Sequence, residues 1–317
     1  MKRIRGRLMA WGAGLLLLGA TAAPAAAAVV SIPGGGCPAT LNGNTSYRLD
    51  GNITQGGGTG ACLSINGNGT TIDLNGYSIS GQGANGADGS GIESSLINAN
   101  TGFASNGNNV TILGPGTIHH FAFCIRLGNH ALIQNVLAHD CQPSFDDPNG
   151  TPIGLGGITL GPWSKCVECR VHNVSVSDPS EGAWCIYMGY GCLLESSIVE
   201  TSDNGAYVGS DCKVWDLVVD SVTKIGARVQ AGTEVARTVI SHCHDGPGIY
   251  YDCNVGGGGP AVTTKACQDS SNSVWCPGGN VPVAGAGGIF INSGNVVTDC
   301  ATNNDGVKFP GNTAQCT

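Results

Sequence analysis

The fold is decided by four short segments that share one pattern: Cys185-Ile-Tyr-Met-Gly189, Gly205-Ala-Tyr-Val-Gly209, Gly226-Ala-Arg-Val-Gln230 and Gly248-Ile-Tyr-Tyr-Asp252. Each alternates apolar residues with residues that would face outward, which is the period of a β-strand. Their central residues are separated by 20, 21 and 22 positions. Because no helical pattern lies between the segments, this regular recurrence predicts a solenoid in which each repeat forms one coil.

The same pattern continues on both sides of these segments. Upstream it is found in Cys124-Ile-Arg-Leu-Gly128 and Gly157-Ile-Thr-Leu-Gly161, and downstream in Gly288-Ile-Phe-Ile-Asn292. A second strand pattern follows, as in Val214-Trp-Asp-Leu-Val-Val219. Stacking would bury the inward residues of each coil against its neighbours, so we expect an all-β, right-handed parallel β-helix of about ten rungs. The residues expected to point inward, nearly above one another, are Ile125, Ile158, Ile186 and Ile249.

The composition favours strands joined by tight turns. Charged residues make up 11% of the 317 residues, against a usual ~25%, and 52 residues are glycine. Lys and Glu, which usually cover helix surfaces, are scarce. The low charge and high glycine content agree with the strand-rich repeat.

The first 28 residues have the order of a secretory signal peptide. A basic start with Lys2 and Arg3 precedes a short apolar run at Leu15–Leu18 and small residues at Ala25–Ala28. Its removal takes away four of 14 basic and none of 22 acidic residues, which leaves a net charge of about −12. An acidic surface argues against nucleic acid and anionic membranes as partners, and it counts against tight binding of an acidic polymer unless cations or a local basic site intervene. We therefore expect a secreted protein that is extracellular, periplasmic or attached to a cell surface.

Two early segments carry a resemblance to a known superfamily. They are Tyr47-Arg-Leu-Asp-Gly-Asn-Ile-Thr54 and Gly69-Thr-Thr-Ile-Asp-Leu-Asn-Gly-Tyr-Ser-Ile-Ser-Gly81. Together they resemble the opening rungs of pectate-lyase-like right-handed parallel β-helix proteins, and the resemblance continues as degenerate repeats to about Asn295. It implies the fold but no single activity, because the superfamily includes lyases, hydrolases, epimerases and adhesins. The hydrolases of this fold usually show a paired-Asp motif and Gly-His-Gly; Asp146-Asp147 matches the first in letters only, and Gly-His-Gly is missing.

The domain organisation follows from the repeat and its interruptions. We expect a signal peptide at residues 1–28, an N-terminal cap at 29–60 and the β-helix at 61–317. Long spacings between equivalent isoleucines predict loops near 141–157 and 253–287. Loops on a rigid scaffold often carry binding residues, although they also serve as plain covers of a side or an end.

The 15 cysteines predict disulfides in an exported protein. Cys192 and Cys212 take matching places on neighbouring rungs, which predicts a bridge between them. Cys37–Cys62 and Cys300–Cys316 are expected from proximity in sequence near each end. The spacing of Cys166 and Cys169 is also that of zinc and redox sites, but no second pair or suitable His accompanies it, so a structural role is favoured. The odd count leaves at least one thiol free or paired with another molecule.

One outward column combines aromatic and basic residues. The candidate substrate-binding residues in it are Arg126, Tyr187, Tyr207 and Tyr250, and Thr159, Arg228 and Phe290 take equivalent places. Aromatic rings offer flat faces to sugar rings, and Arg offers paired hydrogen bonds to carboxylates or hydroxyls. We expect Tyr187, Tyr207 and Arg228 to be solvent-exposed on one face. Plain surface stacking is the alternative, because aromatic residues favour strands.

Acidic residues near the first long loop form a second candidate set. Asp140, Asp146 and Asp147 are candidate ligands for calcium, which prefers carboxylate oxygens. Two carboxylates at a suitable separation would instead serve glycoside hydrolysis. The third reading is that these residues cap turns through their own backbone.

Candidate catalytic residues are fewer. His242 and His244 share one face if their strand runs that far, and each is a potential base or metal ligand. A polysaccharide lyase needs a base for the proton beside the uronate carboxylate and a cation for the developing charge. Lys224 or Arg228 would be that base if its pKa were depressed, with calcium or Arg126 holding the carboxylate. His119-His120 is a further ambiguous pair.

These observations predict a secreted carbohydrate-active protein that acts on or binds an extracellular polysaccharide. Lyase or epimerase chemistry is favoured, and whether the protein is an enzyme at all is left open. The alternative is a non-catalytic extracellular structural or surface protein that self-assembles into rods or fibres. A low charge, many cysteines and an odd thiol are compatible with that second interpretation.

Overall fold

The computed structural model describes most of the chain between residues 28 and 241. The described ranges are 28–37, 40–57, 60–82, 89–94, 107–142, 157–174, 184–230 and 232–241, followed by isolated short strands up to Gln315. Side chains beyond residue 240 lie outside this description.

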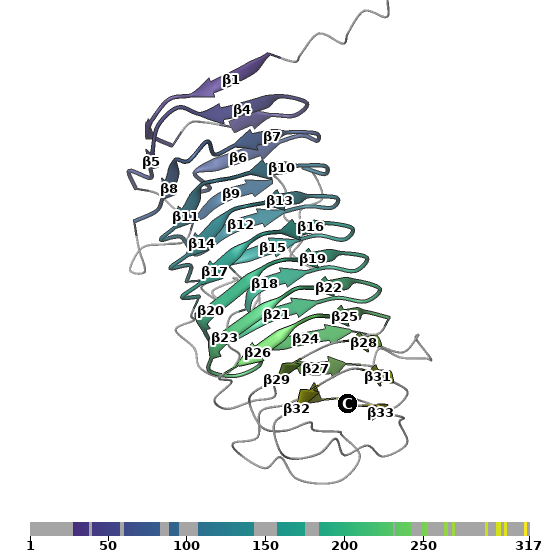
Figure 1. The fold of residues 1–317 in the computed structure, drawn as a ribbon. Helices are drawn as coiled ribbons and strands as arrows, with labels where there is room; N and C mark the ends of the chain where they lie inside the picture. Colours follow the sequence, from purple (N-terminus) through teal and green to yellow (C-terminus); the bar gives the residue numbers. More distant parts are fainter. Residues whose placement is uncertain are drawn as a thin grey trace, which may run out of the picture.

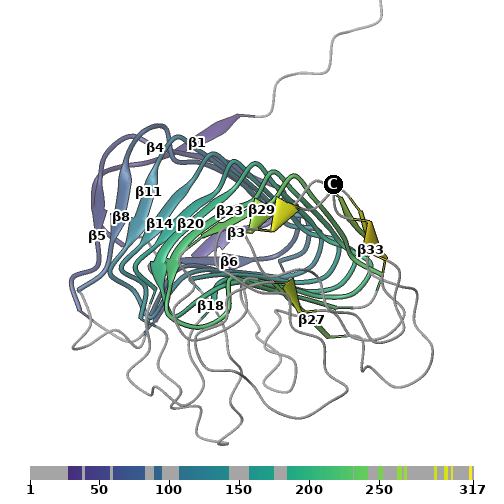
Figure 2. The same ribbon diagram turned by 60° about the horizontal axis from the view of Figure 1, so that its bottom comes forward.

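Three parallel sheets wind around one core, and each coil passes through sheet C, then sheet A, then sheet B (Figures 1 and 2). Sheet A contains β1 (Val29–Ile32), β4 (Ser46–Leu49), β7 (Thr71–Asp73), β10 (Thr111–Leu113), β13 (Leu132–Gln134), β16 (Lys165–Val167), β19 (Leu193–Glu195), β22 (Lys213–Trp215), β25 (Glu234–Ala236), β28 (Thr263–Lys265), β31 (Val296–Thr298) and β33 (Ala314–Gln315). Sheet B contains β2 (Gly35–Gly36), β5 (Ile53–Thr54), β8 (Ser78–Ser80), β11 (Thr117–His119), β14 (Leu137–His139), β17 (Arg170–His172), β20 (Ile198–Ser202), β23 (Val218–Val222), β26 (Val239–Ser241), β29 (Gln268–Asp269) and β32 (Ala301–Thr302). Sheet C contains β3 (Thr40–Asn42), β6 (Leu63–Asn66), β9 (Ser90–Ser94), β12 (Phe123–Leu127), β15 (Ile158–Leu160), β18 (Trp184–Met188), β21 (Asn204–Val208), β24 (Ala227–Gln230), β27 (Ile249–Asp252) and β30 (Ile289–Phe290).

The predicted parallel β-helix is confirmed, because each strand pairs in parallel with the strand one coil away. Right-handed coiling is the sense that crossover connections between parallel strands almost always take. The register also confirms the predicted inward column: Ile125 pairs with Ile158 and Ile158 with Ile186, and all three are fully buried. The pairings then pass through Ala206 and Ala227 to Ile249.

The sharp corner between sheets A and B depends on residues with positive φ. Asn135 has a φ of 54° and donates its backbone N–H to the carbonyl of Val167 on the next coil at 3.0 Å. Asn tolerates this left-handed conformation better than most residues do. The corner therefore turns the chain within two residues, between Gln134 and Leu137, and keeps the repeat short.

The corner between sheets C and A is held by a buried polar ladder. Its members are Ser164, Cys192, Cys212 and Thr233, one on each of four successive coils. Cys212 Sγ accepts the backbone N–H of Cys192 at 3.0 Å and faces the carbonyl of Gly189 at 3.2 Å. Thr233 Oγ1 repeats this pattern one coil later, with the N–H of Cys212 at 3.3 Å and the carbonyl of Gly209 at 2.7 Å.

The predicted Cys192–Cys212 disulfide is wrong, although the register behind it is correct. Leu193 pairs with Lys213, so the two cysteines do lie on neighbouring coils, but both are free thiols. The physical reason is the polar ladder, in which each sulfur faces backbone groups of a neighbouring coil instead of bonding to the other sulfur.

The other cysteines divide between confirmed and unforeseen bridges. The predicted Cys37–Cys62 bridge is present, and Cys166–Cys169 forms a disulfide, which supports the structural interpretation. A bridge between Cys124 and Cys141 was not predicted. Cys185 is a buried free thiol, and Cys300–Cys316 lies outside the described residues.

The strands of the structure can be compared with the expected cap and loops. Within the expected cap at 29–60, β1 to β5 already contribute to the three sheets, so no change of architecture marks its end. Most of the first predicted loop, 141–157, lies outside the described residues. The second predicted loop, 253–287, is interrupted by β28 and β29, which continue sheets A and B. The signal peptide lies outside the described residues, and none of the described residues belongs to a helix long and apolar enough to cross a membrane.

Candidate functional site

The predicted column of outward residues on sheet C is in register. Backbone pairing runs from Arg126 through Thr159, Tyr187 and Tyr207 to Arg228, on β12, β15, β18, β21 and β24. The pairing continues to Tyr250 and Phe290, whose side chains lie outside the description. The structure therefore brings the predicted binding residues onto one face of one sheet.

The expected exposure of this column is wrong. Tyr187, Tyr207 and Arg228 are only partly exposed, and Thr159 is buried. The rings of Tyr187 and Tyr207 stack with centroids 4.6 Å apart and planes within 5°. Two tyrosines at the same place on adjacent strands stack in this way because the distance between adjacent strands is close to the distance between the centroids of two stacked rings. Each thus turns one ring face to the other, and a ligand would meet ring edges and hydroxyl groups.

Neighbouring side chains fix the orientation of Tyr207. Trp184 meets its ring edge-on at a centroid distance of 5.5 Å, and the guanidinium carbon of Arg228 lies 5.5 Å from the ring centroid. Gln230 Nε2 donates a hydrogen bond to the Tyr207 hydroxyl. The ring is held by packing, a cation–π contact and a hydrogen bond, so the surface is preorganised.

Burial shifts the pKa of Tyr187, in the middle of the column, and of Arg126, at one end of it. Burial raises the pKa of Tyr187 to about 12, so its hydroxyl stays protonated and able to donate. Burial also lowers the pKa of the Arg126 guanidinium, while the nearby Glu93 carboxylate acts in the opposite direction. Arg126 lies over the Phe123 ring at 4.3 Å, and its Nε is buried without a hydrogen-bond partner among the described residues.

The remaining predicted site residues do not join this column in the described structure. Lys224 is partly buried in the connection between β23 and β24, where its backbone N–H donates to the carbonyl of Asp203 at 2.8 Å. His242, His244, Asp146 and Asp147 lie outside the described residues. Asp140 is described, and it follows β14 on sheet B.

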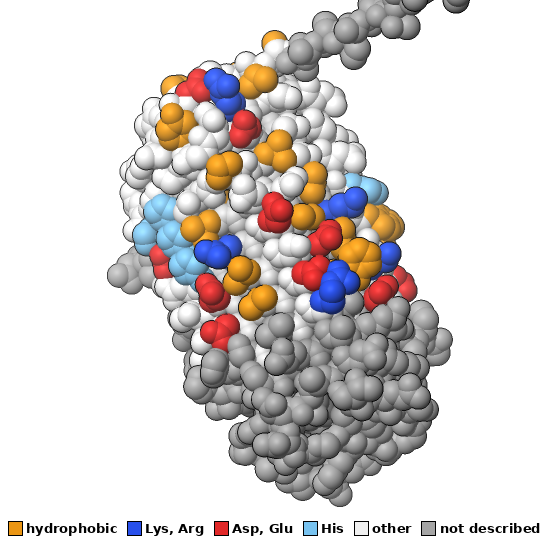
Figure 3. All heavy atoms as spheres, viewed as in Figure 1, with side chains coloured by type: hydrophobic (Ala, Val, Ile, Leu, Met, Phe, Trp, Pro, Cys, Tyr) orange, Lys and Arg blue, Asp and Glu red, His pale blue; other side chains and the backbone are white. Residues whose placement is uncertain are grey.

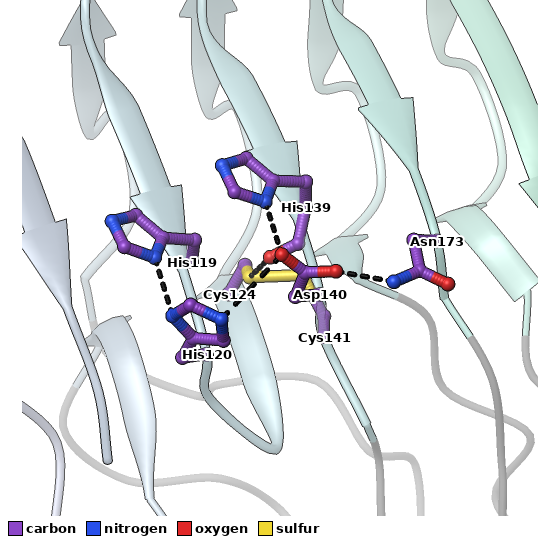
Figure 4. Close-up of a disulfide and its surroundings, with 7 residues drawn as sticks. All are labelled: His119, His120, Cys124, His139, Asp140, Cys141 and Asn173. Carbon is purple, nitrogen blue, oxygen red and sulfur yellow. Dashed lines mark hydrogen bonds and ion pairs between the residues drawn. A yellow bond between two sulfur atoms is a disulfide. The ribbon is translucent and has the colours of Figure 1, made fainter. Parts of the chain in front are cut away.

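Asp140 belongs to a cluster of histidines that the sequence reasoning largely missed (Figure 4). Its carboxylate oxygen Oδ2 lies 2.6 Å from Nδ1 of His139 and 3.5 Å from Nε2 of His120. The other oxygen, Oδ1, accepts a hydrogen bond from the side-chain amide of Asn173. Nδ1 of His120 lies 2.7 Å from Nδ1 of His119, so one of these nitrogens donates to the other.

A ladder of three imidazoles runs through this cluster. His119, His139 and His172 are register partners on β11, β14 and β17. Successive ring centroids are 4.8 Å apart and the planes agree within 2°. In Figure 3 a patch of histidine side chains is visible on the left of the molecule. The signal was present in the sequence, since each histidine ends a second strand, but only the adjacent pair His119-His120 was noticed.

The electrostatics of the cluster disfavour protonation of two of its histidines. Burial, followed by the nearness of His139, lowers the pKa of both His119 and His172. Burial alone would raise the pKa of Asp140, but hydrogen bonds from Asn173 and His139 bring it below its ordinary value. The cluster therefore combines one ionised carboxylate with two imidazoles, those of His119 and His172, that resist protonation.

The cluster does not fit the predicted calcium site. Calcium takes six to eight oxygen ligands, whereas the groups around Asp140 are mostly imidazole nitrogens. No group of three or more His, Cys, Asp or Glu residues is arranged to hold a metal ion within the described ranges. Asp146 and Asp147 lie outside those ranges, so calcium binding by them stays a prediction.

Comparisons with known proteins give two distant structural likenesses. The Dettilon tailspike protein gp208 matches with a TM-score of 0.40 and 12% identity, over 91% of this chain and 54% of that chain. The chain thus spans about half the length of the tailspike. The A-module of the mannuronan C-5 epimerase AlgE6 of Azotobacter vinelandii matches with a TM-score of 0.33 and 12% identity, over 91% and 90% of the two chains. No protein-family model and no curated protein sequence matches the chain. Because identity and TM-score are low, neither likeness carries an argument about activity.

Proposed function

We propose that this protein is secreted and binds an acidic extracellular polysaccharide along the outer face of sheet C. The observation that carries the proposal is the in-register column from Arg126 to Arg228. It crosses five strands of one sheet, so its two arginines are separated by about 19 Å at the usual strand spacing. A span of that length suits an extended polymer better than a single small molecule.

The chemistry of the column favours a polymer with carboxylates. Guanidinium groups pair with carboxylates through two parallel hydrogen bonds, and Arg126 and Arg228 lie at the two ends of the tyrosine pair. The tyrosines add ring edges and hydroxyl groups, which suit the mixed apolar and polar surface of a sugar. Uronic-acid polymers combine both features.

Lyase or epimerase chemistry is the activity we favour on such a polymer. Both reactions begin when a base removes the proton beside the uronate carboxylate while a cation stabilises the resulting negative charge. Arg126 would hold the carboxylate, and Lys224, Arg228, His242 or His244 would act as the base. Of these candidate bases, Arg228 lies in the column, whereas Lys224 lies in the connection between β23 and β24.

The test is titration of the secreted protein with polygalacturonate and with alginate. Calorimetry measures binding, and the absorbance of unsaturated product measures lyase activity. Calcium is added or chelated in parallel. Binding with absorbance growth supports a lyase, and binding without it supports an epimerase or a binding protein. An Arg228→Ala variant that keeps affinity but loses turnover assigns that residue to the reaction. If neither polygalacturonate nor alginate binds, the proposal is refuted.

A second candidate function rests on the exposed first strand. β1 begins the coil, and Val29 and Val30 on it are 58% and 45% exposed. An apolar edge strand is a surface on which another chain can pair. A non-catalytic rod that assembles end to end through this edge is therefore the alternative, and sedimentation at increasing protein concentration tests it.

A further inference from the structure

The corner between sheets C and A carries exposed aromatic side chains, away from the column described above. Trp163 is 46% exposed and Tyr190 is 48% exposed. His130 on the preceding coil stacks on Trp163, with centroids 5.1 Å apart and planes 24° apart. Tyr190 on the following coil meets Trp163 edge-on at 4.7 Å. The three rings form one aromatic surface across three coils, which we call the corner platform.

The backbone at Trp163 is unusual for so large a residue. Its φ is 56°, in the left-handed region, where the next coils place Gly191, Asp211 and Gly232. Glycine and Asp adopt this conformation readily, whereas a bulky residue does so against a steric penalty. A strained conformation of this kind is common where a side chain serves a function.

A pocket of about 230 Å³ adjoins the corner platform. Trp163 and Trp215 both line it, together with Lys165, Asp211 and Lys213. The side chain of Trp215 is partly exposed and that of Trp163 is exposed, so aromatic surface is accessible at the pocket.

The lining matches the surface of a sugar ring. A pyranose has an apolar C–H face that packs on aromatic rings and a rim of hydroxyls that both donate and accept hydrogen bonds. The exposed Asp211 carboxylate is an acceptor, and the ammonium groups of Lys165 and Lys213 are donors. The ammonium group of Lys213 already lies 4.9 Å from the centre of the Trp215 ring, which holds it at the pocket.

The charges around the pocket select a neutral sugar. Glu234 is the register partner of Lys213, and Glu195 is the register partner of Trp215. With Asp211, these carboxylates exceed the two lysines by one, so a carboxylated sugar gains little attraction here. Figure 3 shows basic, acidic and hydrophobic side chains gathered on the right of the described face, over β16, β19 and β22.

We infer that the corner platform and its pocket form a carbohydrate-binding site for neutral oligosaccharides. It is separate from the sheet C column in residues and in charge, since the column presents two arginines, whereas the corner has three carboxylates and two lysines. The inference therefore does not rest on the proposed function. A neutral chain would lie against Trp163 and Trp215 and direct hydroxyls toward Asp211 and the two lysines.

The experiment titrates the full secreted chain with cellohexaose, chitohexaose and maltohexaose, and follows calorimetry and tryptophan fluorescence. We expect at least one of these hexasaccharides to bind and to shift the emission. Trp163→Ala and Tyr190→Ala should each weaken that binding about tenfold or more and leave polygalacturonate binding unchanged. Val218→Ala, at an exposed position on sheet B, is the matched control and should bind as the wild type does.

Thermal unfolding of each variant separates a lost site from a lost fold. If Trp163→Ala unfolds, Tyr190→Ala and Lys213→Met carry the test, because these two exposed side chains lie outside the core. Equal binding by folded variants and wild type would overturn the inference. So would failure of the wild type to bind any of the three neutral hexasaccharides. Failure of polygalacturonate to bind, in contrast, would refute only the function proposed for sheet C.

Discussion

Tyr207 lies at the centre of the sheet C column, between Tyr187 and Arg228. Its identity was predicted from the spacing of the repeat, because the period of the inward residues fixes which residue faces outward. Its partial burial was not predictable in the same way. Exposure depends on Trp184 and Gln230, which reach it from one adjacent strand each, and the repeat pattern does not show those contacts.

We expect Tyr207→Ala to weaken polysaccharide binding by about 1–3 kcal/mol, the size of one lost anchor contact. Tyr207→Phe keeps the stack on Tyr187 and removes only the hydroxyl, so its loss should be smaller, about 0.5–1.5 kcal/mol. Calorimetric titration with the acidic polymer measures both. Val218→Ala serves as the control, and equal affinity of all four proteins would reduce the column to surface stacking.

The register predicted for Cys192 and Cys212 is correct, but the disulfide predicted from it is absent. The two side chains are hydrogen-bonded to each other as thiols and are not joined by a covalent bond. Each sulfur also faces backbone groups at this corner, as the hydroxyls of Ser164 and Thr233 do. Side-chain rotamers at a corner are set by such local hydrogen bonds, which spacing alone does not reveal.

The free thiols give a prediction at the same scale. Cys185, Cys192 and Cys212 are buried; burial raises the pKa of Cys185 to about 12, whereas the side-chain hydrogen bond with Cys212 lowers the pKa of Cys192. Burial keeps the reagent away from all three sulfurs, so iodoacetamide should label none of them in the folded protein. All three should be labelled after denaturation without reductant. A disulfide-linked peptide pair containing Cys192 and Cys212 in the mass map would contradict the structure.

At the scale of the strand, sheet B places three imidazoles in one ladder. The register that stacks His119, His139 and His172 follows from the same repeat as the core. The second strands could be aligned from the sequence, but the histidine ladder becomes visible only when the last residues of these strands are compared. The Cys124–Cys141 bridge, one residue beyond Asp140, was also missed because Cys141 falls in an irregular segment.

The ladder makes stability depend on pH. The folded-state pKa values of His119 and His172 lie below the ordinary value of 6.5, so the unfolded chain binds protons that the folded chain does not. Their contribution is therefore fully present above pH 6.5 and is lost as the pH falls below it. Groups facing these rings include His120, Asp140, Glu200 and Arg170, and the lowered pKa of Asp140 adds a further loss at lower pH.

We expect the urea concentration at the midpoint of unfolding to decrease when the pH is lowered from 7.5 to 5.5. A His119→Asn, His172→Asn double variant should show a flatter dependence over that interval, because it no longer carries the two groups that take up protons on unfolding. Urea titrations followed by circular dichroism measure both. A midpoint that rises on acidification, or an unchanged slope in the variant, would show that the ladder does not control stability.

At the scale of the whole molecule, the coil is built from contacts between neighbouring repeats, so its architecture could be predicted from periodicity alone. The inward isoleucines and the outward column follow from it, whereas the Cys37–Cys62 bridge was expected from proximity in sequence. The functional assignment does not follow, because the same coil carries the sheet C column, the histidine ladder and the corner platform. Which surface binds a ligand depends on side-chain charge and exposure, and these vary from coil to coil.

The most direct test of the central claim is the affinity of the protein for oligogalacturonides of increasing length, from monomer to decamer. The two arginines of the column are about 19 Å apart at the usual strand spacing. Affinity should therefore rise with length and level off once one chain reaches both Arg126 and Arg228. In the Arg126→Ala variant it should level off at a shorter length. A monomer that binds as tightly as the decamer, or a length series in which nothing binds, would contradict the account.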